Sequence, residues 1–428
     1  MRTILEWKEA LRTGELDARL RVLYGEEAIE LQRKRYTEAL ESFASRYGEE
    51  RAVAFYSVSG RSELSGNHTD HNHGCVIAAS VDLDILAVAA PSDTGVIRVK
   101  SEGFDEDVVD PAAFCEPRTE RFGRSDALIA GVCAGFAREG YRVGGFDAYT
   151  TSCVPGGSGL SSSAAFEDMI GTLLNHLYND ARISYVEISK ISQYAENVFF
   201  GKPCGLMDQV ACAAGGIVAI DFADPKAPVV EKMDFDMTEK GYHLCIVNTG
   251  GNHADLTDDY AAVPAEMKAV ASALGATVLR EADEASLIAK IPALREAVGD
   301  RAILRALHFF GENRRVALQR EALRRGDLDA FLEGVLESGR SSFCYLQNVY
   351  TTKNLSEQGL SLALCLAERT LKDCRAAWRV HGGGFAGTVQ AFVPRDRVAQ
   401  FKEVMDAAFG EGCCMVLRIR PEGAIRVF

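Results

Sequence analysis

The stretch that decides the fold is residues 154–165, which read Val-Pro-Gly-Gly-Ser-Gly-Leu-Ser-Ser-Ser-Ala-Ala. Before it, apolar and polar residues alternate over 146–151, a pattern typical of a strand. After it, apolar residues recur every three or four positions between Phe166 and Leu177, which predicts a helix. A strand, a glycine loop and a helix in this order direct backbone N–H groups and a helix N-terminus at an anion. The stretch therefore favours a phosphate-binding loop over an ordinary tight turn, with these candidate ATP-binding residues: Gly156, Gly157, Ser158, Gly159, Leu160, Ser161, Ser162 and Ser163.

The composition is that of a globular protein with two domains. The chain has 428 residues, more than one domain usually contains, with 47% hydrophobic and 25% charged residues. A net charge of −14 argues against non-specific nucleic-acid binding, although a local glycine loop can still bind ATP. No run of eighteen apolar residues is present, so no membrane span is predicted. We expect small-molecule partners and neither a nucleic acid nor a membrane; the oligomeric state cannot be read from the sequence.

The N-terminus and the cysteines favour a cytoplasmic protein. Residues 1–12 lack the basic start and apolar core of a secretory signal. The twelve cysteines are scattered without a C-x-x-C pair. In a chain of this size we expect them to be small buried residues in a reducing compartment.

A second informative stretch, residues 60–74, is densely polar and reads Gly-Arg-Ser-Glu-Leu-Ser-Gly-Asn-His-Thr-Asp-His-Asn-His-Gly. Burying these groups unpaired would cost a few kcal/mol each, so they need partners, a ligand or solvent. One interpretation is an exposed polar turn, and another is a loop that lines a polyol pocket. A third is a metal cluster, and hence a metal-dependent hydrolase, although this spacing rarely converges on one ion. Its ligands would be His68, Asp70, His71 and His73.

Each of three further features is, on its own, only weak evidence for a functional site. Glu196 lies at the edge of the apolar side of a predicted helix, where it could face a cleft. Asp208 is an acid in an otherwise small or apolar segment, 205–217, and needs a partner such as Arg61. Residues 381–387 read His-Gly-Gly-Gly-Phe-Ala-Gly before a predicted strand, which suggests close backbone packing against another loop or a ligand.

Taken in order, these segments resemble the GHMP kinase family and, within it, the galactokinases. Residues 60–72 are similar to the signature G-R-x-N-L-I-G-E-H-T-D-Y-N, and 155–164 to the phosphate motif P-x-G-x-G-L-S-S-S-A. Residues 204–209 are similar to C-G-I-M-D-Q, and 382–387 to G-G-G-F-G-G. The resemblance covers roughly residues 40–428.

The resemblance implies an α+β protein with the two-domain GHMP kinase fold and an active site in the cleft between the domains. It places the phosphate loop in an N-terminal domain, residues 31–224. A C-terminal domain, residues 225–428, would close the site. Residues 1–30 are predicted to form an N-terminal helical extension.

The implied activity is transfer of the γ-phosphoryl group of ATP, with Mg²⁺, to the anomeric hydroxyl of galactose or a galactose-like sugar. In this resemblance Asp208 is the base and Arg61 lies beside it; an adjacent arginine keeps a carboxylate ionised. Ser163 and Glu196 would be the metal ligands, since magnesium prefers hard oxygen donors. The residues implied to contact the sugar are Asn67, His68, Asp70, Gly205, Asp208 and Tyr260.

The sugar signature departs from the family pattern at several positions, of which position 67 bears on specificity; Ser65 and His71 also differ, from an isoleucine and a tyrosine. Asn67 stands where the family has a glutamate that contacts the 6-hydroxyl of the sugar, and Glu63 stands where it has an asparagine. An amide both donates and accepts hydrogen bonds, whereas a carboxylate only accepts them. The change at position 67 leaves room for a different group at C6 of the sugar, or for weaker binding of galactose. An alternative substrate is another galactose-like sugar, such as N-acetylgalactosamine. A non-catalytic regulator that binds ATP and sugar is the alternative from another class.

Overall fold

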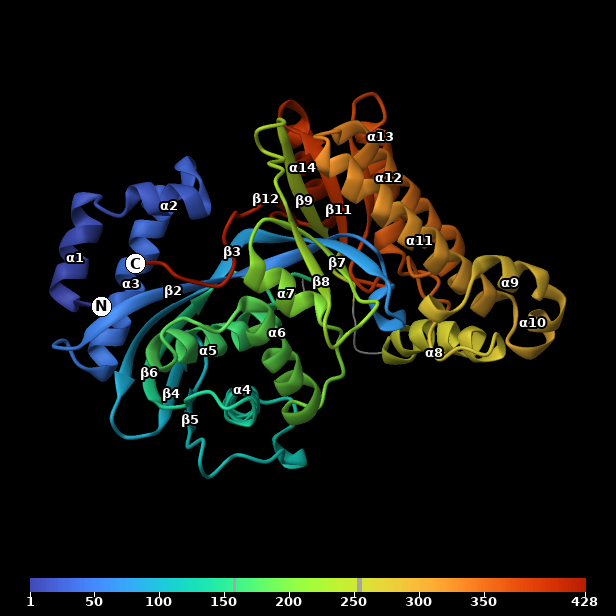
Figure 1. Ribbon diagram of the computed structural model, residues 1–428. Helices are drawn as coiled ribbons and strands as arrows, with labels where there is room; N and C mark the ends of the chain where they lie inside the picture. The colour runs from blue at the N-terminus through green and yellow to red at the C-terminus, as the bar shows by residue number, and fades with distance from the viewer. Residues whose placement is uncertain (157–158, 252–255) are drawn as a thin grey trace.

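The computed structural model describes residues 1–156, 159–251 and 256–428 (Figure 1). Its helices and strands alternate irregularly along the chain, as expected of an α+β protein. They are, in order, β1 (Arg2–Thr3), α1 (Ile4–Thr13), α2 (Asp17–Tyr24), α3 (Ile29–Tyr47), β2 (Ala52–Ser65), β3 (Cys75–Ser92), β4 (Ile97–Ser101), β5 (Glu106–Val109), α4 (Ser125–Arg138), β6 (Gly145–Ser152), α5 (Ser162–Tyr178), α6 (Tyr185–Tyr194), α7 (Met207–Ala214), β7 (Ile217–Asp221), β8 (Val229–Met233), β9 (Tyr242–Asn248), α8 (Thr257–Ala273), α9 (Glu284–Ala289), α10 (Ile291–Ala297), α11 (Asp300–Arg324), α12 (Leu328–Ser341), α13 (Gly359–Leu371), β10 (Ala377–His381), β11 (Thr388–Pro394), α14 (Val398–Phe409), β12 (Cys414–Leu417) and β13 (Ile425–Arg426).

The larger of two sheets is built around the long strands β2 and β3. Its strand order is β1-β2-β3-β6-β4-β5, with β13 also on β2 and the pair β7-β8 also on β3. Neighbouring strands in this sheet are antiparallel, except that β4 and β6 are parallel to each other. The predicted strand before the phosphate loop is β6 and the predicted helix after it is α5, so both predictions are confirmed.

Helices cover both faces of the larger sheet because successive strand residues point to opposite sides. Val53 and Phe55 of β2 pack in one core with Trp7 and other residues of α1–α3. Ala54 and Tyr56 belong to the core on the other face, where α4 and α5 lie. Figure 1 shows α1–α3 beside the sheet, on the opposite side from α4–α7. The Glu-, Arg- and Leu-rich composition of residues 1–45 predicts helices, which α1–α3 confirm, and these helices form one layer of the core.

The smaller sheet is antiparallel and has the order β10-β11-β9-β12. Sequence patterning predicts its strands at 242–248, 388–393 and 415–419, and β9, β11 and β12 confirm them within two residues. Helix α12 packs on β10, and α13 packs on β10 and β11. Helices α8–α10 project from this part of the molecule, on the side away from the N-terminal helices (Figure 1). Two sheets, each with its own helices, give the α+β architecture.

The domain boundary at residue 224 stays a prediction. Two strands beyond it, β8 and β13, pair with β7 and β2 in the larger sheet. The chain therefore enters the part built on the smaller sheet after β8 and returns to the larger sheet at its end.

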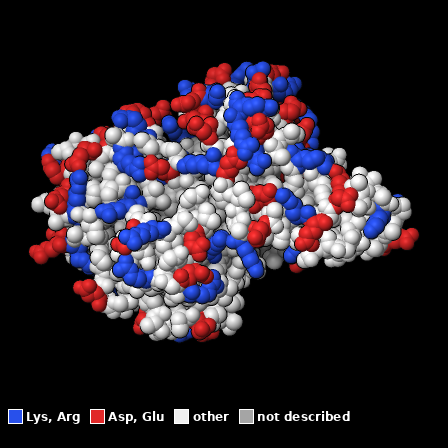
Figure 2. Space-filling model, viewed as in Figure 1, with Lys and Arg blue, Asp and Glu red and all other residues white. Residues whose placement is uncertain are grey.

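The surface is mixed in charge and carries several thiols. Figure 2 shows acidic and basic side chains interspersed over most of one face. The twelve cysteines are unpaired, and the expectation that they are buried is wrong for Cys115, Cys153, Cys344 and Cys365, which are exposed. Among the described residues, every helix is too short or too polar to cross a bilayer.

The packing of α1–α3 predicts that Leu20→Ala lowers the free energy of unfolding by about 2–5 kcal/mol, because Leu20 is fully buried and its removal leaves a cavity. The matched control is Leu31→Ala, since Leu31 is 66% exposed in the same helical layer. We expect the control to change stability by less than about 0.5 kcal/mol. Urea unfolding monitored by circular dichroism measures both. Equal effects would mean that the N-terminal helices are not part of the core.

Candidate functional site

The predicted phosphate loop runs from the end of β6 to the start of α5. Leu160 is fully buried and anchors the loop in the core of the larger sheet. Gly159 and Ser161 have φ of 73° and 60°, a left-handed conformation that glycine adopts without strain. The hydroxyl of Ser161 donates to Asp208 and does not cap α5, so the first turn of the helix keeps N–H groups for an anion. The predicted residues Gly157 and Ser158 lie outside the described residues.

Arg61 on β2 joins this loop to Asp208 in the first turn of α7. The Arg61 Nε and Nη2 atoms lie 2.9 and 2.7 Å from Asp208 Oδ1. The Arg61 Nη1 atom donates to the carbonyl of Gly159, and its backbone N donates to Leu160 O at 3.1 Å. Ser161 Oγ donates to Asp208 Oδ2 at 2.6 Å. The two residues predicted to be catalytic are therefore in contact with each other and with the loop.

The electrostatics keep Asp208 ionised. Burial by itself would raise the pKa of Asp208, but the Arg61 charge and the hydrogen bonds from Ser161 and Arg61 outweigh it and hold the pKa below its ordinary value. The Arg61 side chain is only 7% exposed, whereas that of Asp208 keeps 32% exposure. The carboxylate can therefore meet a ligand while its partner stays fixed.

The two predicted metal ligands also meet. Ser163 Oγ donates to Glu196 Oε1 at 3.1 Å, and Lys202 Nζ lies 3.1 Å from the same oxygen. Glu196 sits in a π-helical turn, Ala195–Phe199, a departure from α-helix that is frequent at functional sites. Its other oxygen accepts from Gln209 Nε2 at 2.9 Å. A carboxylate and a hydroxyl converging on one point fit a hard divalent cation, and Lys202 places a positive charge at that point.

Three residues predicted to bind the sugar contact the glycine loop at 382–384 instead of standing free. Each donates to a successive carbonyl oxygen of that loop. The contacts are Asn67 Nδ2 to Gly382 O at 2.7 Å, His68 Nε2 to Gly383 O at 2.9 Å and Tyr260 OH to Gly384 O at 2.9 Å. Burial lowers the pKa of His68 to about 4, so its ring is neutral near pH 7 and Nε2 carries the proton that Gly383 accepts.

Asn67 differs from the other two because it is fully buried. Its second amide hydrogen is donated to Glu63 Oε1 at 3.0 Å. Its own oxygen accepts from Asn348 Nδ2 at 2.9 Å and Ser342 Oγ at 3.3 Å. The protein thus occupies every hydrogen-bonding position of this amide. His68 and Tyr260 are partly exposed and can still reach a ligand.

Asp70 and Gly205 form another predicted pair in contact. A Cβ atom on Gly205 would lie 2.2 Å from Asp70 Oδ2, so the Asp70 carboxylate can occupy this place only because residue 205 is glycine. Asp70 has a 14% exposed side chain and begins a short 3-10 turn, Asp70–Asn72. The pair keeps the carboxylate next to the segment that leads to Asp208.

The metal-cluster interpretation of residues 68–73 gains no support from this geometry. His71 is 39% exposed and lies 3.8 Å from Asp70, while the His68 ring bonds to Gly383. Within the ranges that the structure describes, no three His, Cys, Asp or Glu side chains gather in a way that could hold an ion.

Several residues around the site were not found from the sequence. Lys202 beside Glu196 is one; a single lysine in a loop carries no pattern. His381 begins the segment 381–387 that was expected to pack closely, but its partners were not expected: it lies 3.0 Å from Ser62 Oγ and 2.9 Å from Thr388 Oγ1. Arg379 pairs with Glu63 at 2.5 Å. The alternation of β2 could have placed Arg61 and Glu63 on one face, but it does not indicate that the partner of Glu63 lies on β10 of the other sheet.

Two family models match the segments that form this site, one over the phosphate loop and Asp208 and the other over the polar stretch 60–74. The GHMP kinases N terminal domain matches residues 127–216, and the galactokinase galactose-binding signature matches residues 41–91. A galactokinase of Streptomyces coelicolor is 30% identical over 375 residues, which cover 86% of this chain and 92% of that protein. A Homo sapiens galactokinase is 32% identical over 315 residues, 71% of this chain and 76% of that protein.

The fold is likewise similar to solved structures. The crystal structure of Lactococcus lactis galactokinase complexed with galactose matches with a TM-score of 0.74 and 24% identity, covering 90% of this chain and 98% of that one. A mevalonate kinase matches with a TM-score of 0.59 and 14% identity, covering 85% and 98%. The identity to the curated relatives, over most of both chains, shows that this chain belongs to the galactokinase family of GHMP kinases.

Proposed function

We propose that the protein transfers the γ-phosphoryl group of ATP to the anomeric hydroxyl of galactose, giving galactose 1-phosphate and ADP. The observation that carries this proposal is the Arg61–Asp208 pair. It lies against Gly159 and Ser161, where the phosphate loop turns into α5. Transfer of a phosphoryl group to an alcohol needs a proton acceptor for the hydroxyl and a cation beside the phosphates. The ionised carboxylate and the fixed guanidinium next to the anion site fit these two roles.

Asp208 would orient the sugar hydroxyl and receive its proton. Because its pKa is depressed, the carboxylate is a weak base, and proton transfer is favourable only late, once the hydroxyl oxygen has begun to bond to phosphorus. Arg61 would remain in place throughout, held by Gly159 and Leu160, and would stabilise negative charge on the group in transfer. The 2.6 Å hydrogen bond from Ser161 is the contact that an incoming hydroxyl would replace.

Ser163 and Glu196 would hold the divalent cation that accompanies ATP, and we propose Mg²⁺. Both supply hard oxygen atoms. Ser163 lies in the first turn of α5, where phosphates are expected, and Glu196 is in contact with it. When bound, the cation neutralises phosphate charge. Gln209 fixes the second oxygen of Glu196, so the first oxygen is the one presented.

For the sugar we propose His68, Asp70 and Tyr260, with Gly205 giving Asp70 its room. Galactose is the first candidate because the family signature that matches residues 41–91 is the galactose-binding one. The relatives named galactokinase add to this support.

The test of the function is release of ADP from Mg-ATP with a panel of galactose, N-acetylgalactosamine, glucose, arabinose, 6-deoxygalactose and galacturonate. We expect the highest kcat/KM with galactose. A higher value with another sugar of the panel would assign that sugar as the substrate. Bound ATP without turnover on any sugar would favour a regulator over an enzyme.

Asp208→Asn is expected to lower kcat by about 10²–10⁴-fold, because it removes the proton acceptor while keeping the size of the side chain. The affinity for ADP, measured by calorimetry, should change little. Asp221→Asn is the control, an acid exchanged on β7 outside the site, and should keep parental kcat. Near-parental turnover of Asp208→Asn would exclude Asp208 as the proton acceptor.

Glu196→Gln is expected to raise the Mg²⁺ concentration needed for half-maximal activity by at least about tenfold, since a neutral amide binds the cation more weakly than a carboxylate does. Glu187→Gln on α6 is the matched control and should leave the requirement unchanged. The measurement is an Mg²⁺ titration of ADP release at fixed ATP. An unchanged requirement in both variants would remove Glu196 from the metal site.

A further inference from the structure

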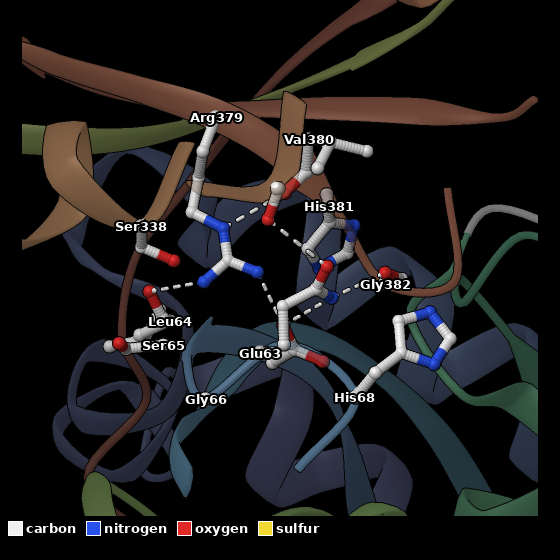
Figure 3. Close-up of polar contacts among 12 residues, drawn as sticks. Glu63, Leu64, Ser65, Gly66, His68, Ser338, Arg379, Val380, His381 and Gly382 are labelled. Carbon is white, nitrogen blue, oxygen red and sulfur yellow. Dashed lines mark hydrogen bonds and ion pairs between the residues drawn. The ribbon is translucent and has the colours of Figure 1, made fainter. Parts of the chain in front are cut away.

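A buried ion pair joins the two sheets behind the glycine loop. Glu63 on β2 and Arg379 on β10 are in contact through Oε1 and Nη2 at 2.5 Å, and their side chains are 6% and 0% exposed. Arg379 also donates to Leu64 O at 3.3 Å and to Val380 O at 2.9 Å. Figure 3 shows the guanidinium of Arg379 directed at Glu63 and Leu64. One buried negative charge thus balances one buried positive charge.

Asn67 extends this pair to the glycine loop. One amide hydrogen goes to the same Glu63 oxygen that Arg379 binds, at 3.0 Å, and the other goes to Gly382 O at 2.7 Å. The backbone of Asn67 is fixed as well: its N donates to Glu312 Oε1 at 3.3 Å and its O lies 3.0 Å from His308 Nε2. Position 67 must therefore be a donor toward two acceptors at once, and an amide meets that requirement.

The charge at position 63 restricts the residue at position 67. A carboxylate at 67 beside Glu63 would put two negative charges about 3 Å apart in a buried place and would face the Gly382 carbonyl as well. If residue 63 were neutral, Arg379 would be a buried charge without an acid to balance it. Position 67 lies next to residue 63, so it is the neighbouring position where that acid could stand. Two of the departures from the family signature, Glu63 and Asn67, are in this view one exchange of an acid and an amide.

The loop that Asn67 holds reaches the phosphate loop. His381 directly precedes Gly382 and bonds to Ser62, the neighbour of Arg61 on β2. A Cβ atom on Gly159 would lie 3.2 Å from His381 Nδ1 and 3.3 Å from Thr388 Oγ1, so the space between Gly159 and these two side chains has little room for a larger residue. A shift at Gly382 would move His381 against Gly159, whose carbonyl binds Arg61.

We propose that Glu63 and Asn67 form a single positioning unit, in which Asn67 holds the glycine loop against the phosphate loop and does not bind the sugar. The proposal deepens the proposed function and rests on it for the identity of the site. It assigns sugar recognition to the partly exposed residues, and it assigns position 67 to the geometry of the nucleotide end of the cleft. Asn67 is thus a positioning residue, since it acts through Gly382 and His381.

The test is a cycle of nearly isosteric variants: Glu63→Gln, Asn67→Asp and the two combined. Asn67→Asp places two acids together, and Glu63→Gln leaves Arg379 unpaired, so each alone should lower Tm by at least about 4 °C. The combined variant restores one acid for one arginine, and we expect it to recover more than half of the summed loss. Ser65→Ala, which removes a 2.5 Å contact of the same strand with Gln319, is the control and should show no such coupling with Asn67→Asp. If the losses of Tm in the two single variants simply add in the combined variant, Glu63 and Asn67 do not act as one unit. If a single variant does not fold, a folded combined variant counts as the expected recovery. A combined variant that also fails to fold would overturn the proposal.

The second readout separates positioning from sugar binding. In the combined variant an acid faces the Gly382 carbonyl, so the loop contact is lost although the charge is balanced. We expect the Kd for ADP to rise about three- to tenfold, the equivalent of one hydrogen bond, with the order of sugars in the panel unchanged. An unchanged Kd would overturn the link to the phosphate loop, and a changed order of galactose and 6-deoxygalactose would make residue 67 a sugar contact. The Tm measurements and ADP binding do not depend on turnover. Absence of sugar kinase activity would therefore contradict the proposed function, while the role of Glu63 and Asn67 could still be tested.

Discussion

The ion pair between Arg61 and Asp208 is the interaction on which the site depends. It brings together strand β2, the phosphate loop and the first turn of α7, which are far apart in sequence. Arg61 is nearly buried, and a buried guanidinium without a partner is costly, so the pair fixes the loop as firmly as it fixes the carboxylate. The same contact holds Asp208 in its ionised form. The Arg61–Asp208 ion pair therefore fixes the position of the loop and also the protonation state of the carboxylate.

Other buried charges connect the remaining layers in the same manner. Asp84 on β3 is fully buried and accepts from Arg35 of α3 and Arg420 near the C-terminus, at 2.6 and 3.0 Å. Tyr24 donates to the same carboxylate at 2.5 Å. Burial would raise the pKa of Asp84, yet the two arginines and the hydroxyls around it keep the pKa below its ordinary value. Such pairs add less to net stability than apolar packing does, but removing one partner leaves an uncompensated buried charge, which is strongly destabilising.

Local patterns in the sequence predicted the elements around the site, and contacts between distant segments decided the rest. The strand, glycine loop and helix at 146–178 could be predicted because each has its own residue period. The pairing of Asp208 with Arg61 could be expected because an acid in an apolar segment needs a cation. The burial of Asn67 could not, since a polar loop of this composition fits a surface turn equally well. Its partner Glu63 is close in sequence, but Asn348 and Gly382 come from segments that only the folded chain brings to it.

The pairing of β13 with β2 has a consequence for how the protein is made. Ile425 and Arg426 pair with Ser57 and Tyr56, and Phe428 packs on Trp7 and Phe55, so the N-terminal core includes residues from the far end of the chain. During synthesis this core cannot close until Ile425 has left the ribosome, and the flank of β2 that β13 covers stays open meanwhile. An open strand is a template for pairing with another chain. Yield from expression should therefore depend on the rate of synthesis and on chaperones more than the stability of the finished fold would suggest.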